Sequence, residues 1–196
     1  MAYEELKSSG ITAKTPENIM LGAGTIHRGF TLTDGKWNFE ESLIGATSGG
    51  SKFSIKPEYY TVPVDGALVK VKGLEHKVGE TAAMEVNFVE MTPEILAMTV
   101  VGDVAVSENF EGYTEIKSRA RIQESDYIEN LAYVGKKTDG TPIIIIFDQA
   151  ICTSGLEVEG KNKEAGVFAG TFECVADLTP EADTLPWRIL YPTPTV

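Results

Sequence analysis

The sequence is poor in basic residues: 17 Lys and Arg stand against 29 Asp and Glu, a formal net charge of -12 over 196 residues. Phosphate contacts need lysine and arginine clustered on one surface, so this deficit disfavours a protein that grips nucleic acid tightly. Apolar residues make up 42% of the chain, which is ordinary for a globular protein. We therefore expect one domain over residues 1–196 with one sizeable core.

Cysteine and histidine are scarce, with two of each. Cys152 and Cys174 lie in strand-like stretches, which favours buried free thiols, with a disulfide as the alternative. His27 and His76 are far apart, and there is no CxxC or CxxH spacing, so a structural zinc site is not expected. No cofactor is predicted either.

Long apolar runs are missing. The longest, Ile143–Phe147, is far too short to span a bilayer. The first ten residues, MAYEELKSSG, lack the basic start and apolar core of a secretory signal. We therefore expect no membrane segment and a protein made to stay in the cytoplasm.

Catalytic motifs are also missing. The glycine-rich stretches at 22–24 and 45–50 have neither the Walker lysine nor the full GxGxxG order. There is no GxSxG elbow, and neither histidine is predicted beside a nucleophile. Two carboxylate pairs, Glu157 with Glu159 and Glu124 with Asp126, could serve as acid and base, but such spacing is more typical of a solvated face. An enzyme is not expected.

The most informative stretch is residues 78–100, a predicted strand that leads into a capped helix. Ala82, Met84, Val86 and Phe88 alternate with the polar side chains of Thr81, Glu85 and Asn87, the pattern of a half-buried strand. Thr92 offers a capping hydroxyl, Pro93 suits the first helical position and Glu94 favours the positive helix end. Residues 68–78 are predicted to pair with this strand as a long hairpin through residues 73–80.

Further strands are predicted at short intervals. Glycines interrupt a strand near residues 19–32, Asp139-Gly140 predicts a hairpin between two apolar runs, and the β-branched run at 143–147 predicts a strand covered on both faces. Asn38 with Glu41 has the layout of a capping box and predicts a short helix. The expected fold is mainly β, a β-sandwich or barrel with one flanking helix. Extended segments are expected as an N-terminal arm at 1–18, an exposed loop at 45–57 and a C-terminal arm at 178–196.

Five segments carry a family resemblance: PENIMLGAGTIHRGF, GATSGGSKFSI, PVDGALVKVKGLEHKVGETAAMEVNFVEMTPE, VFAGTFECVAD and LPWRILYP. In their order they resemble the major tail proteins, or tail tube proteins, of long-tailed bacteriophages and prophages. The resemblance implies a β-sandwich-like fold and hexameric rings stacked into a hollow tube through which DNA passes without specific binding. It also implies a place in the virion tail after assembly in the host cytoplasm, with a tape measure protein and a tail terminator as partners.

This resemblance suggests roles for individual residues. A conduit for DNA should repel phosphates, so the wet face of the central strand is expected to line the lumen, with Glu85, Asn87 and also Glu129 as candidates. Contacts between subunits or rings are expected at the loops and arms, with these candidates: Gly45, Ser48, Gly49, Gly50, Lys52, Phe53, Leu74, His76, Trp187 and Tyr191.

Two alternatives stay open at this point. The first is a soluble β-barrel module that binds a small apolar ligand among Phe53, Tyr59, Tyr133 and Phe147. The second is a related virion part, a tube-end or connector protein that forms one ring and stops. A self-assembling tube subunit differs from both in forming stacked rings.

Overall fold

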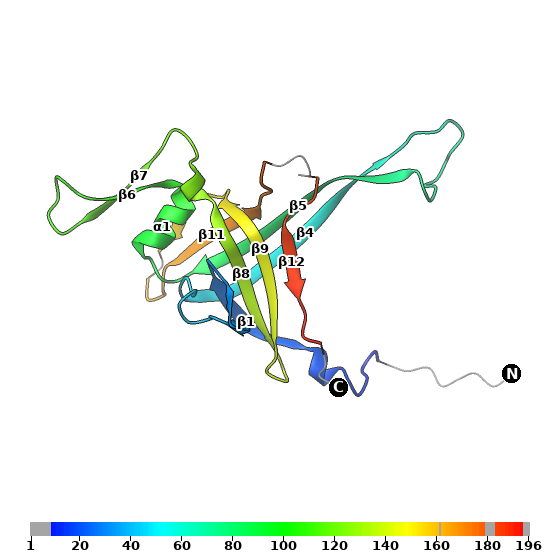
Figure 1. The fold of residues 1–196 in the computed structure, drawn as a ribbon, viewed down its shortest axis with the longest axis horizontal. Helices are drawn as coiled ribbons and strands as arrows, with labels where there is room; N and C mark the ends of the chain where they lie inside the picture. The colour runs from blue at the N-terminus through cyan, green and yellow to red at the C-terminus, as the bar shows by residue number, and fades with distance from the viewer. Residues whose placement is uncertain (1–8, 161, 179–182, 194–196) are drawn as a thin grey trace.

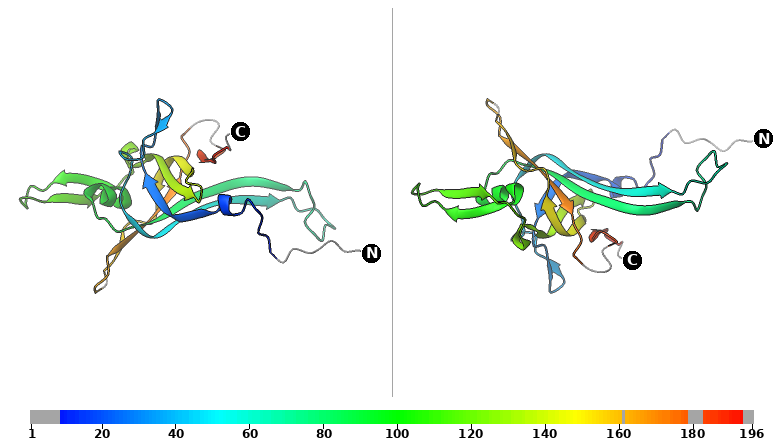
Figure 2. Two further views of the ribbon diagram at one scale, coloured as in Figure 1. Left: turned by 90° about the horizontal axis from the view of Figure 1, so that it is seen from below. Right: turned by 90° about the horizontal axis from the view of Figure 1, so that it is seen from above.

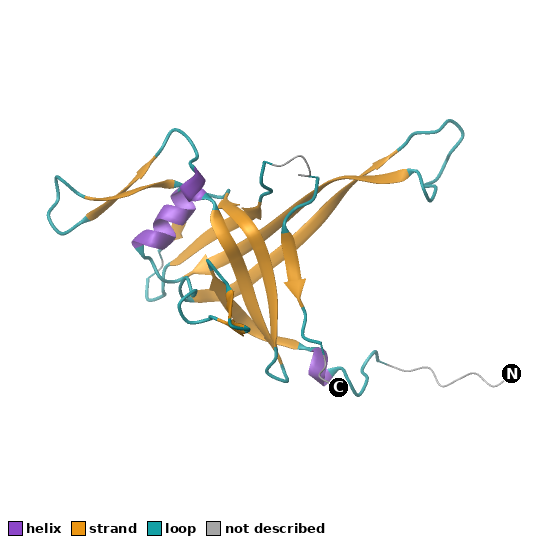
Figure 3. Ribbon diagram, in the orientation of Figure 1, coloured by secondary structure: helices purple, strands orange, loops and turns teal. Residues whose placement is uncertain are grey.

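The computed structural model describes residues 9–160, 162–178 and 183–193. The fold is mainly β, as expected, with one α-helix and two short 3-10 turns in these ranges. The elements, drawn in Figure 1 and coloured by type in Figure 3, are η1 (Pro16–Asn18), β1 (Met20–His27), β2 (Leu32–Thr33), β3 (Lys36–Trp37), β4 (Thr47–Thr61), β5 (Glu75–Phe88), α1 (Pro93–Val100), β6 (Gly102–Val106), β7 (Thr114–Ser118), η2 (Glu124–Asp126), β8 (Ile128–Lys137), β9 (Pro142–Cys152), β10 (Glu157–Glu159), β11 (Val167–Cys174) and β12 (Trp187–Leu190).

One antiparallel sheet dominates, in the order β1-β8-β9-β11-β5-β4, with β10 added beside β11 and β12 beside β9. Residues 42–46 join its two end strands. Leu43 forms a β-bridge with His27, the Ile44 backbone N–H donates to Ile26 O at 3.0 Å, and the Val89 N–H donates to Ala46 O at 3.0 Å. The sheet therefore curls into a barrel-like body (Figure 1).

The interior is built on the alternation of β5. Ala82, Met84, Val86 and Phe88 are buried, as predicted, and Phe88 meets Phe172 of β11 edge to face at 6.3 Å. The other buried members of this cluster come from β1, β8, β9, β11 and α1. A single core thus holds six elements together.

The apolar run of β9 is covered on both faces, as its unbroken sequence predicted. Phe147 faces the main interior, whereas Ile144 and Ile146 belong to a second cluster on the opposite side of the sheet. The β2–β3 hairpin covers that cluster, where Phe30 stacks on Trp37 at 4.8 Å between ring centroids.

The predicted helix and the predicted 138–141 turn are both confirmed. Thr92 Oγ1 accepts a hydrogen bond from the Ile95 N–H at 3.2 Å, and Pro93 occupies the first turn of α1. At the β8–β9 turn, Asp139 Oδ1 accepts from the Thr141 N–H at 2.9 Å, and Gly140 adopts a φ of 86° that favours glycine.

The 45–57 segment corrects an expectation, because most of it lies in strand β4 and not in a loop. Gly49 and Gly50 have φ of 78° and 81°, and the register with β5 shifts between Thr47 and Ser51. The glycines therefore make a β-bulge within the strand, since pairing with β5 outweighs the local preference of Gly and Ser for loops.

The partner of β5 was also predicted wrongly. β5 begins at Glu75 and pairs with β4, while residues 62–74 form the loop that connects the two strands. The helix expected from Asn38 and Glu41 is a turn. One capping bond is present, the Glu41 N–H donating to Asn38 Oδ1 at 3.2 Å, but Leu43 immediately bridges to β1, so no helix continues.

Hairpins project from the body in several directions (Figure 2). The β4–β5 arm, defined as residues 56–81, extends from one end of the long axis, and the β6–β7 hairpin, residues 102–118, extends from the opposite end (Figures 1 and 2). The β10–β11 hairpin leaves from a third side.

The terminal arms are described only in part. Of the expected C-terminal arm, residues 187–190 form β12 and pair with β9, so this part is a strand of the main sheet. Of the expected N-terminal arm, residues 9–18 are described, and η1 lies beside the β8–β9 turn, where the Thr138 hydroxyl bonds to Pro16 O. Residues 1–8, 179–182 and 194–196 lie outside the described residues. No helix in the described ranges is long and apolar enough to cross a membrane.

The two faces of β5 give the first prediction. Met84→Ala should lower the free energy of unfolding by about 2–5 kcal/mol, because it removes a fully buried side chain. Glu85→Ala, the next residue along, should cost less than about 1 kcal/mol, because its ion pair with Lys52 is exposed. Chemical denaturation of the unassembled chain measures both. A larger loss for Glu85→Ala than for Met84→Ala would mean that the register of β5 is displaced by one residue.

Candidate functional site

A broad polar surface covers one side of the sheet where β4, β5 and β11 run together. Across it, Lys52, Glu85 and Thr171 stand in register on adjacent strands. Lys52 Nζ lies 2.7 Å from Glu85 Oε1. We call this surface the outer face; its members are Lys52, Ser54, Lys56, Thr81, Ala83, Glu85, Asn87, Ala169, Thr171 and Glu173.

The outer face combines small side chains with charges and carries no large apolar residue among these members. Asn87 is held by the bulge of β4, because its Nδ2 donates to Gly50 O at 3.3 Å. Glu157 of β10 pairs with Ala169 and so extends the face by a further carboxylate. A smooth, polar surface results, on which three carboxylates stand against the two lysines Lys52 and Lys56, with a shallow depression of about 200 Å³ beside Glu85 and Asn87.

The structure brings two of the three lumen candidates together. Glu85 and Asn87 share the outer face, two positions apart on β5. Glu129 lies on β8 and lines a cavity beside α1, so it belongs to another part of the surface. Glu173, which the sequence analysis did not single out, shares the outer face with Glu85 and is exposed.

The inter-subunit candidates fall into two groups. Ser48, Gly49, Gly50 and Lys52 lie at the bulge and outer face, and Leu74 and His76 lie on the β4–β5 arm. The four others contact their own chain: Gly45 packs beside Glu90 and Ile95, Phe53 meets Phe147 at 5.6 Å, Trp187 Nε1 donates to Glu80 Oε1 at 2.6 Å, and Tyr191 OH donates to Asn18 Oδ1 at 3.1 Å.

Exposed apolar side chains gather on the two long projections. On the β4–β5 arm, Leu68 is 94% exposed and Val69 76% exposed. On the β6–β7 hairpin, Val106 is 81% exposed and Tyr113 69% exposed. The exposure of Leu68 and Val69 was not predicted, because residues 68–78 were expected to form a strand. The glycines that flank the run ALVKV at 67–71, Gly66 and Gly73, are the signal that marks it as a loop.

The β6–β7 hairpin is fixed to the body by one arginine. Arg119 Nη1 lies 2.9 Å from Asp103 Oδ1 of β6, and its Nη2 contacts Asp126 of η2. The side chains of Arg119 and Asp126 are both largely buried, which makes this pairing far less tolerant of loss than an exposed one. These ion pairs therefore fix the orientation of the β6–β7 hairpin relative to the body.

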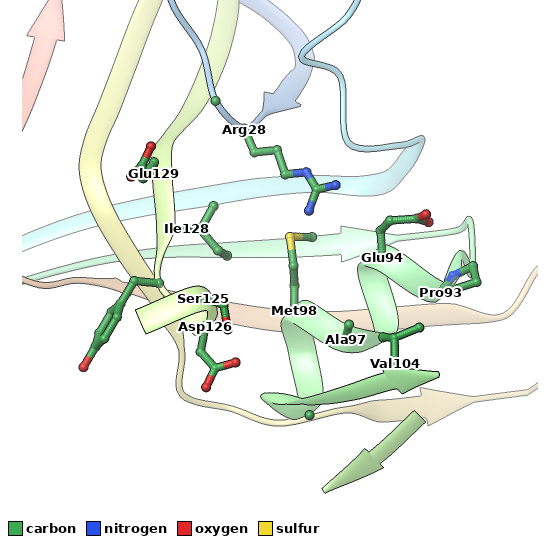
Figure 4. A pocket seen from close by; sticks show the side chains of 13 residues that line it. Arg28, Pro93, Glu94, Ala97, Met98, Val104, Ser125, Asp126, Ile128 and Glu129 are labelled. Atoms are coloured by element: carbon green, nitrogen blue, oxygen red, sulfur yellow. The ribbon is translucent and has the colours of Figure 1, made fainter. Parts of the chain in front are cut away.

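A groove lies at the base of that hairpin, between α1, β6 and the start of β8 (Figure 4). Its volume is about 540 Å³. Apolar walls come from Pro93, Ala97, Met98, Val104 and Ile128, and charges from Arg28, Glu94, Asp126 and Glu129. We call it the α1 groove.

Arg28 reaches across the α1 groove toward Met98 and Glu94 (Figure 4). The pKa of Glu94 is held below its usual range by the hydrogen bond from its own backbone N–H, then by the Thr92 hydroxyl, with the charge of Arg28 adding to both. The groove thus stays charged at neutral pH while its floor is apolar.

His27 corrects a second expectation, since it does lie between two hydroxyl groups. Its Nδ1 is 2.9 Å from Ser42 Oγ and its Nε2 is 2.8 Å from Thr25 Oγ1. Ser42 Oγ donates to Asn38 O at 2.6 Å, so Nδ1–H must donate to Ser42, which leaves Nε2 to accept from Thr25.

This trio lies where the barrel-like body closes. A serine-type triad needs a carboxylate to stabilise the imidazolium, and in the described residues none hydrogen-bonds to His27. Burial lowers the pKa of His27, opposed by a hydrogen bond with the Phe39 backbone, and so works against the charged form. The three residues stand where residues 42–46 join β1, beside a cavity of about 670 Å³.

The residues considered for binding an apolar ligand or a metal ion do not lie together in one site. Phe53, Tyr133 and Phe147 pack in the core, whereas Tyr59 is exposed on the β4–β5 arm, so the four residues proposed for an apolar ligand line no common cavity. Within the described ranges, no three His, Cys, Asp or Glu side chains are grouped to hold a metal ion.

The thiols of Cys152 and Cys174 are free and buried, as predicted. Burial raises the pKa of the Cys174 thiol to about 12, with smaller contributions from Asp148 and Glu80. The Cys174 thiol is therefore not poised to react as a thiolate.

Comparison with known proteins gives a structural likeness. No protein-family model and no curated protein matches the sequence. Among solved structures, the chain is similar to a chain of the structure titled "Virion of native gene transfer agent (GTA) particle", at 12% sequence identity and a TM-score of 0.41. The alignment covers 85% of this chain and 95% of that one.

The buried imidazole gives a pH prediction. His27 has a folded pKa below its ordinary 6.5, so its contribution to stability is complete above pH 6.5 and is lost as the pH falls through the folded pKa. Between about pH 7.5 and about pH 5, the free energy of unfolding should fall further for the wild-type chain than for His27→Gln, which keeps a donor and an acceptor. Denaturant titrations at each pH test this. Parallel pH profiles would contradict it.

Proposed function

We propose that this chain is a structural virion protein, the subunit of a phage-type tail tube, which self-assembles into hexameric rings that stack into a conduit for DNA. One observation carries the proposal: a small closed body sends out long hairpins on which apolar side chains such as Leu68, Val69 and Val106 remain largely exposed among the described residues. The likeness of five sequence segments to tail tube proteins agrees with it.

The accessible surface supports assembly in quantitative terms. The chain exposes 14,282 Å², whereas a compact monomer of this mass exposes about 9,000 Å². The sixteen residues outside the described ranges can account for at most about 2,500 Å² of this, at the area per residue of an unfolded chain. At least about 2,800 Å² remains in excess, and a standard interface takes about 800 Å² from each partner. Each subunit thus has room for several contacts.

The outer face suits the wall of the conduit. Its strands alternate between core and solvent, so one side builds the body while the other presents Glu85, Asn87 and Glu173. The carboxylates of this wall outnumber its lysines by one when Glu157 is included, and a small excess of negative charge disfavours adhesion of the DNA phosphates during passage. Small neighbours such as Ala83 and Ala169 keep the wall smooth.

Edge-to-edge joining of neighbours would complete the wall. β4 is an end strand of the sheet, paired with β5 on one side only along most of its length. In a closed ring of subunits such edges are covered, which removes the exposed strand edges that favour uncontrolled aggregation. A ring is therefore the assembly that best fits this sheet.

The remaining elements of the proposal follow from the family resemblance. A tail tube is built in the host cytoplasm, becomes part of the virion, and works with a tape measure protein and a tail terminator. A tube-end or connector protein of related fold is the alternative, and it would form one ring without stacking. Neither role involves catalysis.

The charge of the conduit can be tested directly. At concentrations where the wild-type chain pellets as assemblies, these should not retain short DNA duplexes at low salt. Assemblies of the Glu85→Lys, Glu173→Lys variant should retain duplexes, protect them from nuclease and release them as salt rises.

A control variant, Glu40→Lys with Glu17→Lys, makes the same charge change away from the outer face and should leave retention at the wild-type level. Equal retention by both variants would show that the outer face does not line the conduit. A wild-type chain that never pellets would contradict the tube itself.

A further inference from the structure

The two ends of the molecule are complementary in shape and charge. The tip of the β4–β5 arm, residues 62–74, lies at one end of the long axis, and the α1 groove lies at the other (Figures 1 and 4). Such a pair of surfaces cannot meet within one chain. They can meet between two copies placed head to tail.

The tip is an apolar surface with few charges. Leu68 and Val69 are the most exposed apolar residues in it. The loop is nevertheless shaped by its own backbone bonds, Ala67 N–H to Val64 O at 3.1 Å and Leu74 N–H to Val71 O at 3.1 Å. A preformed apolar tip loses little conformational entropy when it docks.

The charges of the tip oppose those of the groove. The tip carries Asp65, Lys70 and Lys72, of which Lys70 is paired with Glu75 at 2.6 Å. Besides Asp126, which is buried and paired with Arg119, the groove carries the carboxylates of Glu94 and Glu129 against the guanidinium of Arg28. In a chain with a net charge of -12, an exposed lysine-bearing apolar tip is a suitable partner for such a groove.

The apolar lining of the α1 groove also suits an apolar loop tip. Ala97, Met98 and Val104 line it, and a thioether side chain adapts to the shape of an incoming apolar group. Its volume of about 540 Å³ admits a few side chains, as a loop tip presents, and not a whole domain.

We infer that the α1 groove is the receptor for the 62–74 tip of a second copy of this chain. This inference rests on the proposed tube function and specifies one of its contacts. With the copies placed head to tail the contact is heterologous, so repeating it generates a closed ring or an open filament. Arg119 holds the β6 wall of the groove against η2, and so keeps the receptor open.

Cysteine cross-linking tests the contact. The double variant Leu68→Cys, Ala97→Cys should form a covalent ladder of multimers under mild oxidation, seen on a non-reducing gel. An equimolar mixture of the two single variants should give cross-linked dimers that contain one copy of each. The native Cys152 and Cys174 are buried, so the wild-type chain should form none.

The control keeps Leu68→Cys and moves the second thiol to Thr33→Cys on the β2–β3 hairpin, outside the groove. If wild-type chains assemble and the control pair cross-links as fast as the test pair, the groove is not the receptor and the tube proposal stands. If wild-type chains do not assemble at any concentration, the tube proposal fails, and the docking inference fails with it.

Charge reversal gives an independent readout of the same contact. Lys72→Glu and Glu129→Lys should each reduce assembly at least tenfold in sedimentation, and the combined variant should recover most of the loss. Lys36→Glu, an equal charge change on the β2–β3 hairpin, should have no such effect. Failure of the combined variant to recover, with both single variants impaired, would overturn the charge pairing.

Discussion

The fold depends on the two-sided character of β5. One side of this strand places Ala82, Met84, Val86 and Phe88 in the core, where a displacement by one residue would expose all four. The same alternation fixes the opposite side as a polar surface with Glu85 and Asn87. Pairing with β4 and β11 then carries both properties across three strands. Core and candidate conduit wall are thus two consequences of one pattern.

Because the sheet closes within one chain, the surfaces that remain available for assembly lie outside the core. Because residues 42–46 join β1 to the β4 end, held beside His27 by Ser42 and Thr25, the core is complete within one chain. The long hairpins add nothing to that core, and their apolar tips stay exposed. A fold that completes its interior and still extends apolar arms is built for contact with neighbours, because isolated monomers rarely expose such patches.

Sequence patterns predicted the elements whose neighbours are close in the chain. The capped helix from Thr92, the Asp139-Gly140 turn and the alternation of β5 each depend on local chemistry. Pairing between segments that are distant in the sequence was harder to predict. Gly49 and Gly50 indicated a loop, but pairing with β5 makes them part of a bulged strand. For the same reason Leu68 was assigned to a strand, and Trp187 to a free arm, although β12 joins β9.

The most direct test of the account is negative-stain electron microscopy of the purified chain over a concentration series, with its solution mass measured in parallel. The account predicts six-membered rings that stack into hollow tubes as concentration rises, because each subunit carries complementary surfaces at its two ends. A chain that stays monomeric at every concentration, or that forms only two-fold dimers, would contradict it.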